Sequence, residues 1–282
     1  MDGSRSELSL TIEAEEQGLL ARARDLAARL GAASVRLEGT APDVPADARG
    51  ATQRARGRAR PEPADGQTAR ELVLSVRRDG LTLRLGTGPE VRASRPALVP
   101  PKGHGPDPLW RAVLAGEYTV VDATAGLGGD GFHLAARGAV VTMIERSPVV
   151  AALLEDALLA AATGALGPEA AEAAARVRLV VGDARDVLRA GALEPRETEV
   201  VYLDPMFHAT GRRSLPPKGM ALFRALMGAD YEAAADLLAA AREVASRRVV
   251  VKRHLRSPRL SEAEPSGAIR SRTVRYDLYA PL

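Results

Sequence analysis

The sequence predicts an α/β fold in which a mostly parallel sheet forms the larger part of the chain and a small α+β subdomain precedes it. Two observations favour this class. From residue 118 to the C-terminus, short apolar runs alternate with helical patterns, which indicates parallel strands joined by right-handed crossovers. The chain has 282 residues, of which 46% are hydrophobic and 27% charged, so it can bury one full core and support a small appendage.

Residues 1–95 are expected to form the small subdomain. Leucine and alanine recur at helical spacing over residues 17–30, which predicts an amphipathic helix. Residues 38–70 contain almost no large apolar side chain and are rich in Pro, Gly, Ala and Arg, so we expect a flexible insertion there. Apolar and polar residues then alternate on both sides of Asp79-Gly80, which predicts a β-hairpin.

Residues 96–282 are expected to form the larger domain. Its strands are predicted at residues 118–122, 140–145, 177–181, 199–204, 248–252 and 274–280, with helical segments between most of them. Ligands of such sheets bind at the carboxyl ends of the parallel strands, so a functional site is expected at that edge.

Composition excludes several classes of function. The chain has no cysteine, which rules out disulfides, thiol catalysis and cysteine-ligated zinc, and its four histidines show no metal-ligand spacing. We therefore expect no metal. The sequence contains neither a long uncharged apolar run nor the apolar core of a secretory signal, so we expect a cytoplasmic protein with no membrane partner. We also expect a monomer.

A glycine-rich turn follows the first predicted strand of the larger domain. The stretch VVDATAGLGGDG, residues 120–131, spaces three glycines as Gly126-x-Gly128-x-x-Gly131. This spacing matches the fingerprint in which the pyrophosphate of a dinucleotide approaches a helix N-terminus. It equally matches the corresponding turn of S-adenosylmethionine methyltransferases, so the glycines alone leave both cofactors open.

Four acidic residues stand at or just beyond the ends of successive predicted strands: Asp122, Glu145, Asp183 and Asp204. One acid in such a place often caps the next turn or helix, but four in succession favour a binding site. Glu145 lies about 20 residues beyond Gly126, the distance at which an acid binds ribose hydroxyls. Asp183 is expected to face an adenine edge. Both assignments suit NAD as well as S-adenosylmethionine.

The segment Asp204-Pro205-Met206-Phe207 separates the two cofactors. It resembles the (Asp/Asn)-Pro-Pro-aromatic motif of methyltransferases that act on exocyclic amino groups of bases or on side-chain amides. A carboxylate and the carbonyl of a fixed proline turn can accept both N–H hydrogens and draw such a nitrogen toward tetrahedral geometry, which frees its lone pair. Phe207 is expected to stack on a base rotated out of its helix.

Five stretches resemble one family, the RsmJ-type 16S ribosomal RNA guanine-N2 methyltransferases. They are VVDATAGLGGDGFHLA, ERSPVVAALLEDAL, VVYLDPMF, RVVVKR and RYDLYA, and they are distributed over residues 120–280. The resemblance implies a class I (Rossmann-like) methyltransferase fold with a mostly parallel seven-stranded sheet. It also implies S-adenosylmethionine as methyl donor and a guanine N2 of 16S ribosomal RNA, free or in the 30S subunit, as acceptor.

The same resemblance implies cofactor contacts at Gly129, Asp130, Glu145, Arg146, Asp183, Ala184 and Asp204. The strand-end and glycine patterns add Asp122, Gly126 and Gly128 to the expected cofactor site. The segment Asp204-Pro205-Met206-Phe207 makes Asp204, Pro205 and Phe207 the expected catalytic residues. Two positions depart from the family pattern: Gly129 stands where an arginine is usual, and His208 stands where a proline is usual.

The C-terminal part of the chain is basic, with ten Lys or Arg side chains between residues 242 and 275. We expect Lys252 and Arg253 to contact RNA phosphates, and Lys102 and Lys218 to add contacts from loops. Two other functions stay open. One is methylation of an adenine or cytosine amino group in DNA or RNA, and the other is a non-catalytic, cofactor-dependent role as an RNA-binding assembly factor.

Overall fold

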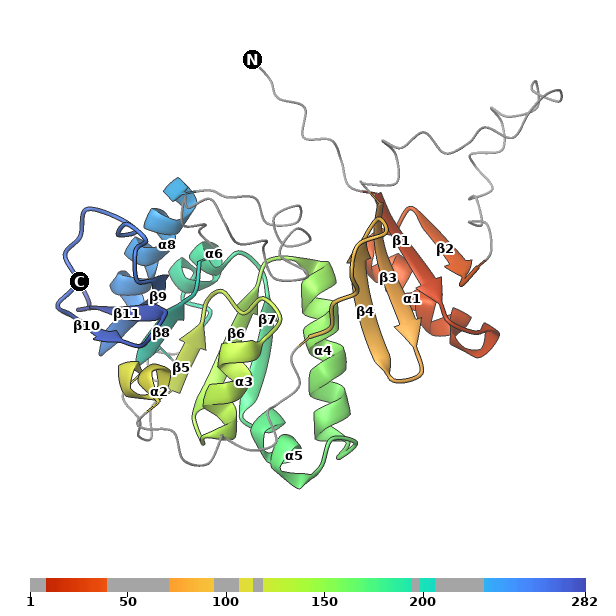
Figure 1. Cartoon of the computed structure of the whole chain (residues 1–282), viewed down its shortest axis with the longest axis horizontal. Coiled ribbons are helices and arrows are strands. Elements are labelled where there is room, and N and C mark those ends of the chain that lie inside the picture. The colour runs from red at the N-terminus through yellow and green to blue at the C-terminus, as the bar shows by residue number, and fades with distance from the viewer. Residues whose placement is uncertain (1–8, 40–70, 94–106, 114–118, 194–197, 206–230) are drawn as a thin grey trace, which may run out of the picture. The chain divides into compact units, whose positions relative to one another are not determined.

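The computed structural model describes residues 9–39, 71–93, 107–113, 119–193, 198–205 and 231–282 (Figure 1). The described residues fall into two compact units, which divide between Arg92 and Ala93. All but the first two residues of the insertion predicted at 38–70 lie outside the described part of the chain. Within the described residues, no helix is both long and apolar enough to cross a membrane.

The N-terminal unit contains a sheet of four strands and one principal helix. Its elements are β1 (Ser9–Ala14), η1 (Gln17–Leu19), α1 (Leu20–Leu30), β2 (Ser34–Leu37), β3 (Glu71–Arg77) and β4 (Gly80–Leu85). The sheet order is β2-β1-β3-β4, and β1 runs parallel to both of its neighbours. The antiparallel β3–β4 pair confirms the predicted hairpin, and α1 confirms the predicted helix, which ends at Gly31 in the left-handed conformation.

The C-terminal unit alternates strands and helices. Its elements are α2 (Pro108–Ala112), β5 (Thr119–Asp122), α3 (Gly129–Ala136), β6 (Val140–Glu145), α4 (Pro148–Ala162), α5 (Pro168–Ala174), β7 (Val177–Val181), α6 (Ala184–Arg189), β8 (Val200–Leu203), α8 (Tyr231–Val244), β9 (Arg248–His254), β10 (Gly267–Arg270) and β11 (Val274–Tyr279). The sheet has seven strands in the order β10-β11-β9-β8-β5-β6-β7.

The seven-stranded sheet is mostly parallel, as predicted. Strand β11 pairs antiparallel with β9 and with β10, and the remaining pairs are parallel. The chain leaves β5 toward β6 and β7, and later returns to β8 and β9 on the other side of β5. The strand order therefore reverses between β5 and β8, and a crevice at the carboxyl ends of these two strands is where such sheets bind ligands.

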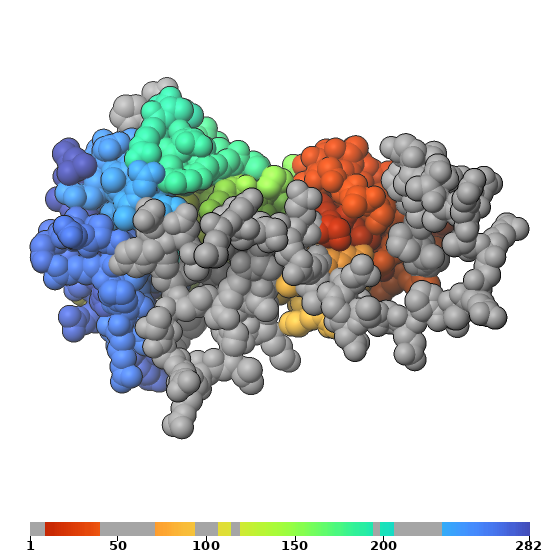
Figure 2. Space-filling view, turned by 90° about the horizontal axis from the view of Figure 1, so that it is seen from above, coloured from red at the N-terminus to blue at the C-terminus, as the bar shows by residue number. Residues whose placement is uncertain are grey.

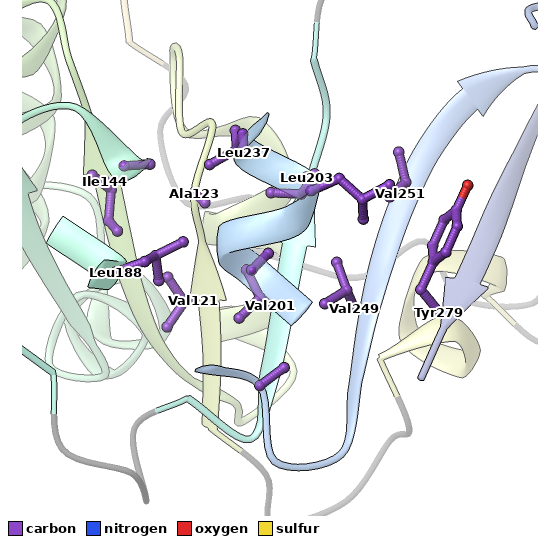
Figure 3. Close-up of a cluster of buried hydrophobic side chains, with 14 of the residues drawn as sticks. Val121, Ala123, Ile144, Leu188, Val201, Leu203, Leu237, Val249, Val251 and Tyr279 are labelled. Carbon is purple, nitrogen blue, oxygen red and sulfur yellow. The ribbon is translucent and has the colours of Figure 1, made fainter. Parts of the chain in front are cut away.

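The face of this sheet that packs against α6 and α8 has an apolar centre. Val121 of β5, Val201 of β8 and Val251 of β9 are fully buried and pack with leucines of α6 and α8, as Figure 3 shows. Successive side chains of a strand point to opposite faces, so the residues next to these valines must face the other side. Those residues are Asp122, Tyr202 and Lys252, and the period-two pattern thus gathers polar groups on a single face.

Gly128 allows α3 to begin close to the core. Its φ is 81°, and a Cβ at this position would lie 2.6 Å from Leu154 Cδ2 and 2.8 Å from Phe132 Cε2. At the next turn, a Cβ on Gly131 would lie 2.5 Å from Met143 Cε and 3.1 Å from Asp122 Oδ2. These two glycines of the fingerprint therefore permit close packing of the helix on the sheet.

We expect Gly128→Ala to destabilise the protein by about 2–4 kcal/mol. About 1 kcal/mol arises from the left-handed backbone and about 1–3 kcal/mol from overpacking against Leu154 and Phe132. Gly164→Ala is the matched control, because Gly164 has a φ of 77° and no atom within 4 Å of the added Cβ. Urea unfolding of both variants measures the difference, and equal losses would contradict the packing argument.

Candidate active site

A lysine and two carboxylates form the centre of the site. Lys252 Nζ lies 2.6 Å from Asp130 Oδ2 and 3.0 Å from Asp204 Oδ2. The hydroxyl of Tyr202 also donates to Asp130 Oδ2, at 2.5 Å. The side chains of Lys252, Asp130 and Asp204 are 23%, 29% and 38% exposed, so the group is sheltered but reachable from solvent.

Three different elements bring this cluster together. Lys252 lies on β9, Asp130 in the first turn of α3, and Asp204 directly after the last residue of β8. The backbone N–H of Asp204 donates to Thr124 Oγ1 at 2.6 Å, which ties the end of β8 to the turn after β5. The position of Asp204, and with it that of Pro205, is thus fixed at the point where the strand order reverses.

Burial and opposite charges act together on the pKa values of the cluster. Burial raises the pKa of Asp204, whereas the neighbouring Lys252 ammonium lowers it, and the net shift is upward. Burial lowers the pKa of Lys252, but the carboxylates of Asp204 and Asp130 outweigh it, and the net pKa is raised. Lys252 therefore stays protonated and acts as a fixed positive charge beside Asp204.

Asp122 lies beneath this cluster and is only 2% exposed. Burial raises the pKa of its carboxyl group to about 8, and the nearby Asp130 carboxylate adds to the effect. One hydrogen bond, from Thr124 N to Asp122 Oδ1 at 3.2 Å, opposes the shift. At neutral pH the carboxyl group is therefore mostly protonated, which limits the negative charge that a single lysine must balance.

We expect Asp122→Asn to stabilise the protein increasingly as the pH rises from about 4 to about 8. In this range the folded wild type holds a proton on Asp122 that the unfolded chain has lost, so its stability falls with pH. Asparagine is neutral and keeps the oxygen that accepts from Thr124. Urea unfolding of both proteins at pH 5 and pH 8 gives the comparison, and a difference independent of pH would contradict the assignment.

Glu145 fastens the glycine turn to the end of β6. Its Oε2 accepts from Gly126 N at 2.9 Å, and its Oε1 accepts from Ser147 N at 2.7 Å. Burial raises the pKa of this carboxyl group, while the two backbone hydrogen bonds lower it, with a net rise. Each carboxylate oxygen keeps a second lone pair, so the residue retains acceptor capacity for a hydroxyl group.

Asp183 begins α6 as its N-cap residue. Its Oδ1 accepts from Arg185 N at 3.0 Å, and its Oδ2 pairs with Arg185 Nη2 at 2.6 Å. These contacts with Arg185 hold the pKa of Asp183 below its usual value. Ala184 is the first residue of α6 and is buried, whereas Arg146 and Gly129 are exposed at the starts of the neighbouring loop and helix.

The donors and acceptors at this edge fit S-adenosylmethionine. That molecule presents a ribose diol and an adenine amino group as donors, and it carries positive charge on its ammonium and sulfonium groups. The strand-end acids supply acceptor oxygens in the order in which the strands lie. They are Asp204 after β8, Glu145 at the end of β6 and Asp183 just after β7. Asp122, at the end of β5, is buried and mostly protonated and lies beneath them.

Two basic residues occupy places that differ from those predicted. Lys252 was expected on an RNA-binding surface, but its ammonium group lies between two carboxylates. Arg253 is 4% exposed and donates from Nη2 to Pro258 O at 2.5 Å, so its side chain lies inside the protein. Neighbouring residues on a strand point to opposite faces, so Lys252 and Arg253 cannot serve one surface together.

Four predicted positions lie outside the described residues: Phe207, His208, Lys102 and Lys218. Tyr202 and Thr124, which hold Asp130 and Asp204, were not predicted from the sequence. A signal for Tyr202 exists, because it precedes Asp204 by two residues and so shares its face of the strand. The hydroxyl of Thr124 has no comparable pattern, since its contact depends on how two loops meet.

The chain matches the family model of putative S-adenosylmethionine-dependent methyltransferases over residues 103–281. It belongs to this family. The fold class and the cofactor predicted from the sequence are thereby confirmed, and the dinucleotide alternative is wrong.

Relatives narrow the family further. A ribosomal RNA small subunit methyltransferase J of Thioalkalivibrio sulfidiphilus is 48% identical over 176 residues, which is 61% of this chain and 67% of the relative. A protein of the same name from Hydrogenovibrio crunogenus is 45% identical over 174 residues, which is 61% of this chain and 62% of the relative. The chain is therefore of the RsmJ type, and it spans 67% and 62% of the lengths of these two relatives.

A solved structure resembles the whole chain. An S-adenosylmethionine-dependent methyltransferase of Neisseria gonorrhoeae is 28% identical to this chain, with a TM-score of 0.63. The match covers 96% of each of the two chains. The similarity thus extends beyond the segment shared with the curated relatives.

Proposed function

We propose that the protein transfers a methyl group from S-adenosylmethionine to N2 of a guanine in small-subunit ribosomal RNA. One observation carries the proposal: a carboxylate held by a protonated lysine stands at the end of β8, immediately before Pro205. The relatives named ribosomal RNA small subunit methyltransferase J support the choice of substrate.

The chemistry requires a group that changes the geometry of an amino nitrogen. The lone pair of the guanine amino group is delocalised into the ring, so the nitrogen is a poor nucleophile. Accepting its two N–H hydrogens at the Asp204 carboxylate and the Pro205 carbonyl favours a tetrahedral nitrogen with a free lone pair. Phe207, which lies outside the described residues, is proposed to stack on the flipped base.

Bound S-adenosylmethionine would supply a methyl group on a positively charged sulfur, which leaves as a neutral thioether. On the protein side, Asp204 and Pro205 orient the nitrogen in line with that methyl group. The new N–C bond leaves one surplus proton on the nitrogen, which passes to water or to Asp204. Lys252 is already protonated, so its role is to hold the Asp204 carboxylate in place and not to remove that proton.

The cofactor is proposed to lie along the strand ends. Glu145 would bind the ribose, Asp183 and Ala184 the adenine, and Gly126 would let the backbone approach the methionine part. The proposed cofactor site has five further members: Gly128, Gly129, Asp130, Arg146 and Asp122. Asp130 is suited to contact the positively charged end of the cofactor, because it contributes a carboxylate to the cluster with Lys252 and Asp204.

Nucleoside analysis of a deletion strain tests this function. Ribosomal RNA from cells lacking the gene should lose N2-methylguanosine at one position of 16S RNA, and a plasmid copy should restore it. A lost methyladenosine or methylcytidine would favour the alternative acceptors. Unchanged RNA modification together with a defect in ribosome assembly would favour the non-catalytic alternative. Repeating the methyl-transfer reaction on free 16S RNA and on the 30S subunit shows which of the two is the substrate.

A further inference from the structure

Three arginines crowd two turns at the carboxyl edge of the larger sheet. Arg256 lies in the turn after β9, Arg270 is the last residue of β10, and Arg272 lies in the turn between β10 and β11. All three are exposed, and none of their guanidinium groups forms a hydrogen bond or ion pair with another described residue. We call these residues the arginine rim.

The two turns lie side by side. Strand pairing places Val274 opposite His254 and Arg275 opposite Arg270, so the end of β9 meets the β10–β11 turn. A backbone hydrogen bond from Leu255 N to Thr273 O, at 3.2 Å, joins the turns directly. The two turns that carry the arginine rim are therefore adjacent, and they belong to the C-terminal part of the chain that is coloured blue in Figure 2.

Arg275 makes the turn after β9 rigid. Its guanidinium group donates to Leu255 O at 2.8 Å and to Ser257 O at 2.9 Å, and its Nε pairs with Asp277 Oδ1 at 2.9 Å. These bonds fix the backbone on both sides of Arg256. Prepared geometry lowers the ordering entropy that binding must overcome, which is what a recognition surface needs.

The charges of the rim differ from those of the nearby basic residues. Arg275 is neutralised by Asp277, and Arg259 forms an ion pair with Glu264. By contrast, Arg256, Arg270 and Arg272 present positive charge that no described acid balances. An unbalanced cluster of arginines is complementary to a polyanion, and arginine matches the bidentate geometry of phosphate.

The rim also lies within reach of the proposed active site. Lys252 and Arg256 are four residues apart along β9 and its following turn, so their Cα atoms are at most about 14 Å apart. Both stand at the edge where the parallel strands end. A nucleic acid whose base reaches Asp204 would carry its backbone over this part of the surface.

We propose that the arginine rim binds the phosphate backbone of the RNA whose target base enters the site at Asp204. The proposal rests on the proposed function and replaces Lys252 and Arg253 as the phosphate contacts. These contacts position the RNA without reading its sequence, and they make binding dependent on salt.

RNA binding as a function of salt tests the rim. We expect Arg256→Ala/Arg272→Ala, in the full chain, to weaken binding to 16S RNA at least tenfold at about 0.15 M KCl. The slope of log Kobs against log[KCl] should also become shallower by about 1.4, because two phosphate contacts are lost at about 0.7 each. Fluorescence anisotropy of a labelled RNA fragment measures both quantities.

A control variant that loses two arginines elsewhere in the chain separates the effect of position from the effect of net charge. Arg24→Ala/Arg111→Ala removes two exposed arginines, from α1 and from α2, and should leave the slope unchanged. Arg256→Lys/Arg272→Lys should keep most of the slope. The proposal is overturned if the rim variant binds like the wild type, or if the control variant loses as much. Because binding is measured here and not methyl transfer, this failure is distinguishable from failure of the proposed function.

Discussion

Asp204→Ala is expected to lower the rate of methyl transfer to ribosomal RNA at least about 100-fold. The substitution removes an acceptor that is aimed at the reacting amino group, and loss of one such preorganised hydrogen-bonding group commonly costs about 10²–10³ in rate. Single-turnover transfer of a labelled methyl group at saturating RNA measures the effect.

Two further variants interpret that result. Asp204→Asn keeps one oxygen acceptor but not the charge paired with Lys252, so its rate should fall between those of the wild type and the alanine variant. Asp25→Ala removes an exposed acid from α1 and should behave like the wild type. A rate close to that of the wild type in folded Asp204→Ala protein would remove this residue from the mechanism.

Lys252→Met is expected to destabilise the protein by about 2–3 kcal/mol at pH 8. The change leaves the carboxylates of Asp130 and Asp204 without their shared cation. A fully buried pair costs about 3–5 kcal/mol to break, and partial exposure reduces this value here. Losing the cation raises the folded-state pKa of Asp204 further, so the deficit should shrink as the pH falls toward 5 and this carboxylate takes up a proton.

Urea unfolding at both pH values provides this comparison, with Lys252→Arg as the control that retains the charge. We expect the arginine variant to recover part of the stability. A deficit of equal size at pH 5 and pH 8 would show that packing of the lysine stem, and not its charge, is what the methionine variant disturbs.

The positions of the central strands along the chain could be predicted because each has an apolar run, and most of these runs end at an acid or a glycine. Strands that are covered on both faces require branched apolar residues, and the buried valines of β8 and β9 show this. Strand β10, with the sequence GAIR, and helix α5, with the sequence PEAAEAA, were not predicted. Both are short and lack a periodic apolar pattern, so their positions depend on tertiary contacts.

The residues of the candidate site that could be predicted are those at the ends of strands. Asp122, Glu145, Asp183 and Asp204 do lie at the carboxyl edge, because the period and polarity of the strands determine where each ends. Which partner each acid has could not be predicted. The pairing of Lys252 with Asp130 joins residues 122 positions apart, and only the folded sheet brings them together.

The product of the reaction tests the central claim most directly. Purified protein, S-adenosylmethionine with a labelled methyl group and 16S RNA or 30S subunits are incubated, and the RNA is digested to nucleosides for mass analysis. If Asp204 and Pro205 hold the amino group of a guanine beside the methyl donor, the label appears in N2-methylguanosine. Label in a ring nitrogen, in a ribose hydroxyl or in no nucleoside at all would contradict the account.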